Sequence, residues 1–231
     1  MFKKKMTLLI AFSSMFLHSS ETPVEVEVQL VAVRESFTCD DKKEWISAIQ
    51  GGDIEKIEEY LKFGFDVNCT DENGDTALIW AMAMAKDKIE EILLGHPLLC
   101  VDQLCKHNRT ALINAAKWNK IGATRRLLEM GANTELRDKQ GGAALYDSVR
   151  AGHEEIVGML LEKGAAVDAL FGRLNSTPLM VALYYGRVGS AKKLLEKDAD
   201  ILLKDNAGHR AFDIGMLMDR KELALLVFRN D

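Results

Sequence analysis

Apolar residues recur along this chain in two alternating kinds of segment, each with helical spacing and each followed by a short polar stretch. The first kind opens on a small, hydroxylated or charged residue and runs as "TALIWAMA" (76–83), "TALINAAK" (110–117), "AALYDSV" (143–149), "TPLMVALY" (177–184) and "RAFDIGM" (210–216). The second kind carries paired leucines, as in "ATRRLLEMGANT" (123–134) and "EIVGMLLEKGAAVD" (155–168). Apolar residues at i, i+3 and i+4 lie on one face of a helix, so every segment is predicted to be a short amphipathic helix.

The segments of the first kind recur at a fixed step. They begin at residues 76, 110, 143, 177 and 210, which lie 33 or 34 residues apart. A period of this length is typical of stacked helix-pair repeats, in which each pair buries its apolar face against its neighbours. Because the recurring residues form this spine, function is expected on the variable residues that face outward.

Glycines and short polar stretches predict where the helices end. Gly64, Gly131 and Gly164 follow the second kind of segment, where a left-handed residue ends a helix. The stretches 51–53, 151–153 and 185–187 are predicted to turn the chain from the first helix of a pair into the second. These marks place a helix-turn-helix unit in each repeat.

Residues 41–231 resemble the ankyrin repeat family, through "NGDTALIWA", "AGHEEIVGMLLEKGAAVDA" and "STPLMVALYYG". The resemblance implies an all-α solenoid of stacked helix-turn-helix units with β-hairpin-like fingers. It divides the chain into an N-terminal cap repeat, four repeats and a C-terminal cap repeat, at 41–72, 73–106, 107–139, 140–173, 174–206 and 207–231. Two departures from the family pattern stand out: Pro97 replaces a glycine, so that turn should be altered, and Arg210 replaces the first threonine of its repeat.

The N-terminus has the layout of a secretory signal peptide. Lys3, Lys4 and Lys5 precede an apolar segment at 6–17 and then small polar residues, so residues 1–20 are predicted to be a signal peptide. The apolar segment is shorter than the roughly 20 residues that span a membrane, so no stable span is expected after cleavage. Residues 21–40 are predicted to be a tether, although "VEVEVQLVAV" also suits a strand that docks on the first helices.

The net charge and the absence of catalytic motifs exclude several classes of function. The formal net charge is −5, which argues against nucleic acid as a partner. The zinc-protease pattern that His153 and Glu154 begin is incomplete, because Val157 stands where the second histidine is required. No phosphate-binding loop or nucleophile elbow occurs. The chain is therefore interpreted as a non-enzyme, and no cofactor and no metal are expected.

In the ankyrin family, partners usually contact the finger tips and the inner helices, so the resemblance implies a protein partner, of unknown identity, on the concave face of a monomer. The residues in those positions are Trp118, Tyr184, Tyr185, Lys117, Arg150, Arg109, His107, Asn73, Gln140 and His209. Trp, Tyr and Arg are enriched among interface residues with large energetic effects. The aromatic side chains could instead only cover the ends of neighbouring helices.

Four cysteines leave three interpretations open. In an oxidising compartment, Cys100 with Cys105 and Cys39 with Cys69 could form disulfides. Alternatively, Cys69, Cys100, Cys105 and His107 could bind zinc, although the paired knuckle spacing is missing. In a reducing compartment the cysteines would be free thiols.

The sequence thus predicts an exported module, periplasmic or secreted, that binds a protein without catalysis. Three alternatives remain: a secreted effector that acts on host-cell proteins, a metal-binding or regulatory subunit of an enzyme, and a structural spacer.

Overall fold

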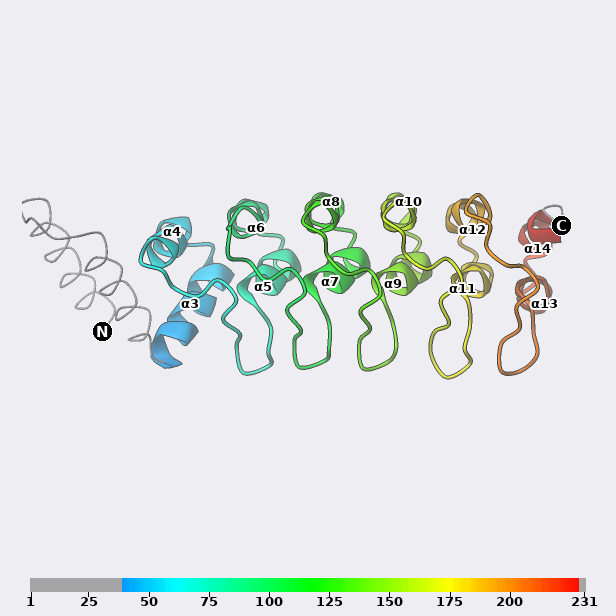
Figure 1. The fold of residues 1–231 in the computed structure, drawn as a ribbon, viewed down its shortest axis with the longest axis horizontal. Helices are drawn as coiled ribbons and strands as arrows, with labels where there is room; N and C mark the ends of the chain where they lie inside the picture. The colour runs from blue at the N-terminus through cyan, green and yellow to red at the C-terminus, as the bar shows by residue number, and fades with distance from the viewer. Residues whose placement is uncertain (1–38, 229–231) are drawn as a thin grey trace, which may run out of the picture.

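The protein is a single-file array of helix pairs, seen in a computed structural model that describes residues 39–228, with side chains from 41 to 227 (Figure 1). The inner helices of the pairs are α3 (Cys39–Gly51), α5 (Ala77–Ala83), α7 (Ala111–Lys117), α9 (Ala144–Ala151), α11 (Pro178–Tyr185) and α13 (Ala211–Leu217). The outer helices are α4 (Ile54–Lys62), α6 (Asp87–Leu94), α8 (Ile121–Glu129), α10 (Glu154–Glu162), α12 (Val188–Leu195) and α14 (Lys221–Phe228). In Figure 1 the outer helices form one row, the inner helices a second, and the loops between pairs project beyond the inner row as fingers.

Each inner helix begins at the recurring position because most repeats place a hydroxyl there. The side-chain oxygens of Thr76, Thr110 and Thr177 accept hydrogen bonds from the backbone N–H three residues on, at 3.4, 3.2 and 3.3 Å. Such an N-cap satisfies one of the N–H groups that the first turn of a helix leaves without a partner. At Arg210 the cap is reversed, since Asp213 accepts from the Arg210 N–H at 2.9 Å. Ala143 has the same extended backbone and no side-chain cap.

The turns inside and after each pair follow the predicted glycines. The residue that turns the chain between the two helices has a positive φ in every pair: Gly52, Ala85, Asn119, Gly152, Gly186 and Asp219. After the outer helices, Gly64, Gly131, Gly164 and Asp198 take this conformation, as expected for residues just past a helix end. Pro97 cannot, because its ring fixes φ near −65°. The turn after α6 is therefore altered, as predicted.

The core runs along the whole array between the two rows of helices. Leu93, Leu127, Leu160 and Leu194, one from each of four outer helices, are fully buried. Opposite them the inner helices contribute small residues such as Ala81, Ala115 and Ala182, which are also fully buried and let neighbouring helices approach closely. At the N-terminal end the rings of Trp45, Tyr60 and Phe65 pack together with centroids 5.0 to 5.6 Å apart.

Three of the five fingers are stabilised by a carboxylate at their first residue. Oδ1 of Asp71 accepts hydrogen bonds from the backbone N–H groups two and four residues on, at 2.8 and 2.9 Å. Asp138 and Asp205 repeat this arrangement in the third and fifth fingers. Cys105 and Gly172 stand at this position in the second and fourth fingers.

Backbone bonds also join successive fingers. The N–H of Lys106 donates to the carbonyl of Asn73 at 3.1 Å, and that of Lys139 donates to His107 at 3.0 Å. Between the third and fourth fingers, within the described chain, the corresponding backbone bond is missing. There the guanidinium of Arg137 donates to the Leu170 carbonyl at 2.6 Å. The fourth finger also lacks the stabilising aspartate, but two backbone bonds between Phe171 and Ser176, each at 3.0 Å, close it.

A second set of polar contacts ties each repeat to the next at the turns after the outer helices. The amide of Asn68 bonds the backbone of Leu98 and Cys100 at 2.8 and 2.6 Å. Acidic side chains continue the series, with Asp102 to the N–H of Asn133, Glu135 to that of Ala166 and Asp168 to that of Asp200, each at 3.0 Å. One polar residue per repeat therefore fixes the register of neighbouring repeats.

The predicted fold class is confirmed. The described residues are all-α, with no β-strand, and the finger pairing is limited to isolated bridges such as that between Thr70 and Thr76. Helix α3 begins at Cys39, two residues before the predicted start of the array, and the repeat boundaries stay predictions. None of the described helices has the length and apolar character needed to cross a membrane. The predicted signal peptide (1–20) and nearly all of the tether (21–38) lie outside the described residues.

The missing cap at Ala143 gives a test of the repeat pattern. Ala143→Thr should raise the free energy of unfolding by about 1 kcal/mol, because the new hydroxyl can accept from the Tyr146 N–H as in the other repeats. Urea unfolding followed by circular dichroism measures the change. Ala143→Val adds the same bulk without an acceptor and should give no gain. Equal stabilisation by both residues would show that packing, and not capping, governs this position.

Candidate functional site

The C-terminal ends of the inner helices carry a row of exposed apolar side chains. Met84, Trp118, Tyr185 and Met218 occupy the same position in four repeats, and Tyr184 and Leu217 precede two of them. We call these six residues the apolar row; their exposed fractions range from 37% for Trp118 to 63% for Leu217. The residues one turn earlier, such as Ala115 and Val181, are buried. The row is therefore where each inner helix passes beyond its contacts with the core.

The predicted aromatic residues lie in this row. Trp118 is the C-cap of α7, and its backbone N–H donates to the carbonyl of Asn114. Tyr184 and Tyr185 end α11 and pack edge to face, with ring centroids 5.0 Å apart. Because all three rings remain more than a third exposed, they cover their neighbours only in part and present apolar area to solvent.

The predicted finger-tip residues use their backbones to build the fingers and leave their side chains outward. Asn73 and Gln140 donate backbone N–H groups to the aspartates of their own fingers, and the carbonyls of Asn73 and His107 join neighbouring fingers. Their side chains make no hydrogen bond within the described part of the chain and are exposed. His209 differs, because its ring lies 3.8 Å from the carboxylate of Asp205.

Both predicted arginines are engaged within the chain. Nε and Nη2 of Arg109 each lie 3.2 Å from Oδ2 of Asp138, which links the second finger to the third. Arg150 pairs with Asp147 at 3.2 Å and lies over the ring of Tyr146 at 5.9 Å. Lys117, also predicted, is half-buried. The two arginines therefore position parts of this face as well as contributing charge to it.

Asp147 is a buried carboxylate at the centre of the array. It lies on α9 and is 4% exposed. One oxygen accepts from Arg150, and the other has no hydrogen-bond partner. Burial raises the pKa of Asp147 above its ordinary value, and the charges of Arg150, Arg109 and Lys117 only partly oppose this effect. Burying the charged form of this carboxylate therefore makes folding less favourable.

The structure does not join the cysteines. Cys100 is exposed and Cys105 is buried, and both are unpaired thiols. Cys69 is buried, with its sulfur 3.8 Å from the Thr70 carbonyl, and the side chain of Cys39 lies outside the described residues. Both disulfide pairings stay predictions. No group of three or more His, Cys, Asp or Glu side chains within the described chain could hold a metal ion, so the zinc set is not brought together.

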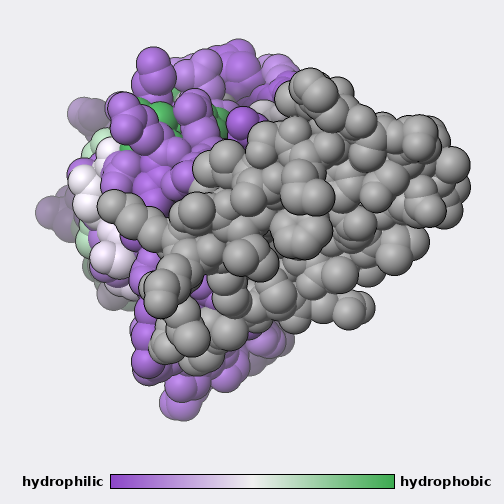
Figure 2. Space-filling view, turned by 90° about the vertical axis from the view of Figure 1, so that its left-hand side faces the viewer, coloured by the Kyte–Doolittle hydropathy of each residue, from purple (hydrophilic) through white to green (hydrophobic). Residues whose placement is uncertain are grey.

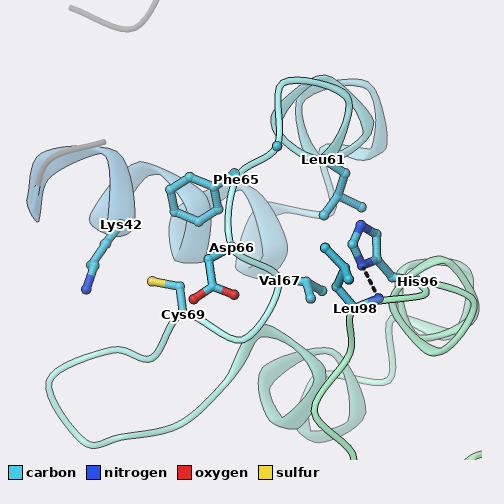
Figure 3. Close-up of a pocket in the computed structure, with 9 residues that line it drawn as sticks. Lys42, Leu61, Phe65, Asp66, Val67, Cys69, His96 and Leu98 are labelled. Atoms are coloured by element: carbon cyan, nitrogen blue, oxygen red, sulfur yellow. Dashed lines mark hydrogen bonds between the residues drawn. The ribbon is translucent and has the colours of Figure 1, made fainter. Parts of the chain in front are cut away.

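A hollow of about 390 Å³ lies between the turns that follow α4 and α6 (Figure 3). Leu61, Phe65, Val67 and Leu98 give it apolar walls, and polar residues such as His96 stand at its edge. Nδ1 of His96 accepts from the Leu98 N–H at 3.3 Å, so this histidine stabilises its own turn. Seen from this N-terminal end, the described surface is mainly hydrophilic (Figure 2). The hollow lies beside the outer turns, away from the apolar row.

The repeat geometry agrees with a family of known proteins. The family model "Ankyrin repeats (3 copies)" matches residues 45–138, 81–170 and 124–205, which together cover more than half of the chain. The chain belongs to the ankyrin repeat family. Ankyrin repeats are protein-interaction modules, and their fold is generally not catalytic.

Known ankyrin proteins resemble the array at different lengths. The human "SH3 and multiple ankyrin repeat domains protein 2" is 30% identical over 190 residues, which cover 81% of this chain and 10% of that protein. The matched part is 18% or less of the length of each of the first curated relatives. An ankyrin repeat domain from Acinetobacter baumannii AYE superposes with a TM-score of 0.76 at 22% identity, covering 82% of this chain and 98% of that one.

A second solved structure is similar. It is a chain from the complex of the predatory endopeptidase Bd0816 of Bdellovibrio bacteriovorus with the immunity protein Bd3460. The TM-score is 0.70 at 22% identity, with 81% of this chain and 97% of that chain covered. At this identity, the likeness of both structures concerns the fold.

Sequence reasoning missed two features of the inner helices. Leu217 and Met218 extend the apolar row, and their position in the repeat, identical to that of Tyr184 and Tyr185, was a usable signal. The burial of Asp147 was not predicted, because it depends on how α9 packs against α7 and α11.

The raised pKa of Asp147 predicts how stability varies with pH. Compared with an uncharged residue, Asp147 contributes most to the free energy of unfolding below about pH 3.9, the pKa of an aspartate in an unfolded chain. This contribution is lost as pH rises through the raised pKa that Asp147 has in the folded protein. The free energy of unfolding of wild type minus that of Asp147→Asn should therefore fall from about pH 3 to pH 7. Urea unfolding at several pH values measures it.

Asp213→Asn is the control of opposite sign. The hydrogen bond from the Arg210 N–H lowers the pKa of Asp213, so its contribution is present above the unfolded pKa and is lost as pH falls. The wild-type advantage over Asp213→Asn should then grow with pH. The same trend in both variants would contradict the assignment of Asp147 as a buried, costly charge.

Proposed function

We propose that this chain is an exported, non-catalytic ankyrin-repeat scaffold that binds a protein partner on the concave face formed by its inner helices and finger tips. The apolar row is the observation that carries this proposal. Six large side chains are exposed at two equivalent positions of the repeat, although the remainder of each inner helix is mostly buried. Aligned exposure of this kind is typical of an interaction surface rather than of scattered surface residues.

The chemistry of the row suits protein recognition. Trp and Tyr bury large areas at low cost in side-chain entropy, and they are enriched where single residues contribute about 2 kcal/mol or more to binding. Trp118, Tyr184 and Tyr185 stand toward the middle of the array, with Met84 and Leu217 toward its ends. Contacts at the centre of an interface are the best shielded from water, so the aromatic residues are expected to dominate the affinity.

The neighbouring structures support a binding role at the level of architecture. A chain of similar fold occurs in the complex of a bacterial endopeptidase with an immunity protein. Two carboxylates on the inner-helix and finger side, Asp138 and Asp147, are committed to structure, since they pair with Arg109 and Arg150. Such groups position fingers and helices, and this supports binding rather than catalysis.

Truncating the aromatic residues tests the proposal. The variant Trp118→Ala/Tyr184→Ala/Tyr185→Ala should reduce recovery of the partner at least about tenfold in pull-downs, because the hot-spot area is lost. Leu98→Ala/Leu202→Ala removes apolar side chains that are at least as exposed but lie on the outer turns, and it should leave recovery unchanged. Equal recovery of every protein by wild type and the aromatic variant would exclude this surface.

Export is tested separately. Expression of the full chain in a bacterial host should yield a mature protein that begins near residue 21 and is found in the periplasmic or extracellular fraction, because residues 1–20 have the layout of a signal peptide. Intact mass measurement of each fraction locates the N-terminus. Recovery of an uncleaved chain only from the cytosol would exclude the exported role and favour a cytosolic partner.

A further inference from the structure

The charge of the array is divided between its two sides. From the second finger to the fifth, the fingers and inner helices comprise residues 104–118, 136–151, 170–187 and 203–218; we call these segments the finger face. They carry ten lysine and arginine residues against four carboxylates, in a chain whose net charge is −5. The acidic surplus therefore lies elsewhere, including the outer helices and the first finger with its Asp71, Glu72 and Asp75.

None of the four carboxylates on the finger face is free to repel an anion. Asp138, Asp147 and Asp205 are buried, and each accepts hydrogen bonds from its own finger or from Arg150. Asp213 pairs with Arg210 at 3.3 Å and accepts its backbone N–H. On this face the exposed and half-exposed charge is thus almost entirely positive.

Several of the cations have no partner within the described chain. The side chains of Lys106, Lys139, Arg173 and Lys204 are exposed, one on each of four successive fingers, and none forms an ion pair or hydrogen bond there. Unpaired lysines are common on protein surfaces, but here they repeat at finger positions along one side of the array. Their alignment gives that side a surplus of positive charge.

We infer that the protein partner presents an acidic segment with apolar side chains to the finger face. This inference rests on the proposed function and adds the partner's chemistry. An inner helix of seven or eight residues separates the fingers from the apolar row, which at 1.5 Å per residue is about 11 Å, the width of one helix. A single segment can therefore place carboxylates against the fingers and apolar side chains against Trp118, Tyr184 and Tyr185.

A protein fits this face better than a nucleic acid does. Met84, Leu217 and Met218 extend the apolar row, and aliphatic side chains gain little from the polar edges of bases. The outer helix α10 of the same thin array carries three glutamates and no cation, which penalises a long polyanion that extends beyond the fingers toward it. An acidic protein segment avoids both costs because it is short and carries apolar residues of its own.

A phage-displayed library of random linear peptides tests the inference although the partner itself is unidentified. Selection on the purified wild-type array should enrich peptides that combine Asp or Glu with aromatic or aliphatic residues. The variant Lys106→Glu/Lys139→Glu/Arg173→Glu should bind an enriched peptide at least about tenfold more weakly. Binding to wild type should also weaken as salt is raised from about 0.05 to 0.5 M.

Lys163→Glu/Lys192→Glu/Lys197→Glu is the matched control. It makes the same change of charge on exposed lysines of α12 and of the turns that follow α10 and α12, which have no ion pair within the described chain. It should leave peptide affinity within about twofold, since charges on the far side are screened over about 10 Å. Circular dichroism and urea midpoints equal to wild type show that both variants fold.

The outcomes separate this inference from the proposed function. Enriched peptides that are neutral or basic, or an unchanged affinity in the finger variant, would overturn the acidic partner while leaving protein binding intact. No enrichment on wild type beyond that on the Trp118/Tyr184/Tyr185 alanine variant would overturn protein binding itself. Labelled oligonucleotides that bind wild type as tightly as the peptides at about 0.15 M salt would show a general anion site and overturn the inference.

Discussion

The array depends on one constraint: a pair of short helices cannot bury its apolar face alone. Apart from α3, the helices have seven to nine residues, too few to be stable in isolation, so their stability comes from stacking against the next pair. Leu93, Leu127, Leu160 and Leu194 are fully buried at equivalent positions because each fills the space between successive repeats. This requirement fixes the spine residues and leaves the finger tips and inner-helix ends free to vary.

Because stability is shared between neighbours, a single repeat can lack one of the local features that stabilise the others. Ala143 lacks a cap, Pro97 lacks the left-handed turn, and Gly172 lacks the carboxylate that stabilises other fingers. In each case the adjacent repeats retain the missing feature. Stacking against these neighbours holds the repeat that lacks it in register.

The sequence predicted what local chemistry decides. The inner helices begin just after Thr76, Thr110 and Thr177 and Gly131 ends its helix as expected, because helix starts and positive φ depend on neighbours a few residues away. Contacts between repeats were not predictable in this way. Arg109 was predicted as a partner contact, yet it pairs with Asp138 29 residues away, and the burial of Asp147 depends on several helices. The signal peptide and the side chain of Cys39 lie outside the described part. The signal peptide and both cysteine pairings therefore stay predictions, although Cys100 and Cys105 are described as separate thiols.

Belonging to the ankyrin family does not identify a partner, since the fold supports many unrelated interactions. In this chain unpaired lysines and Arg173 lie on the fingers, and acids such as Glu154 and Glu155 lie on the outer helix α10. The array therefore carries a surplus of positive charge on its fingers and inner helices, although the net charge of the chain is −5. With the acidic partner that we infer, this charge would orient the approaching protein toward the fingers before any contact forms. Charge would then govern the rate and direction of encounter, and the apolar row would govern how long the complex lasts, because buried contacts mainly control dissociation.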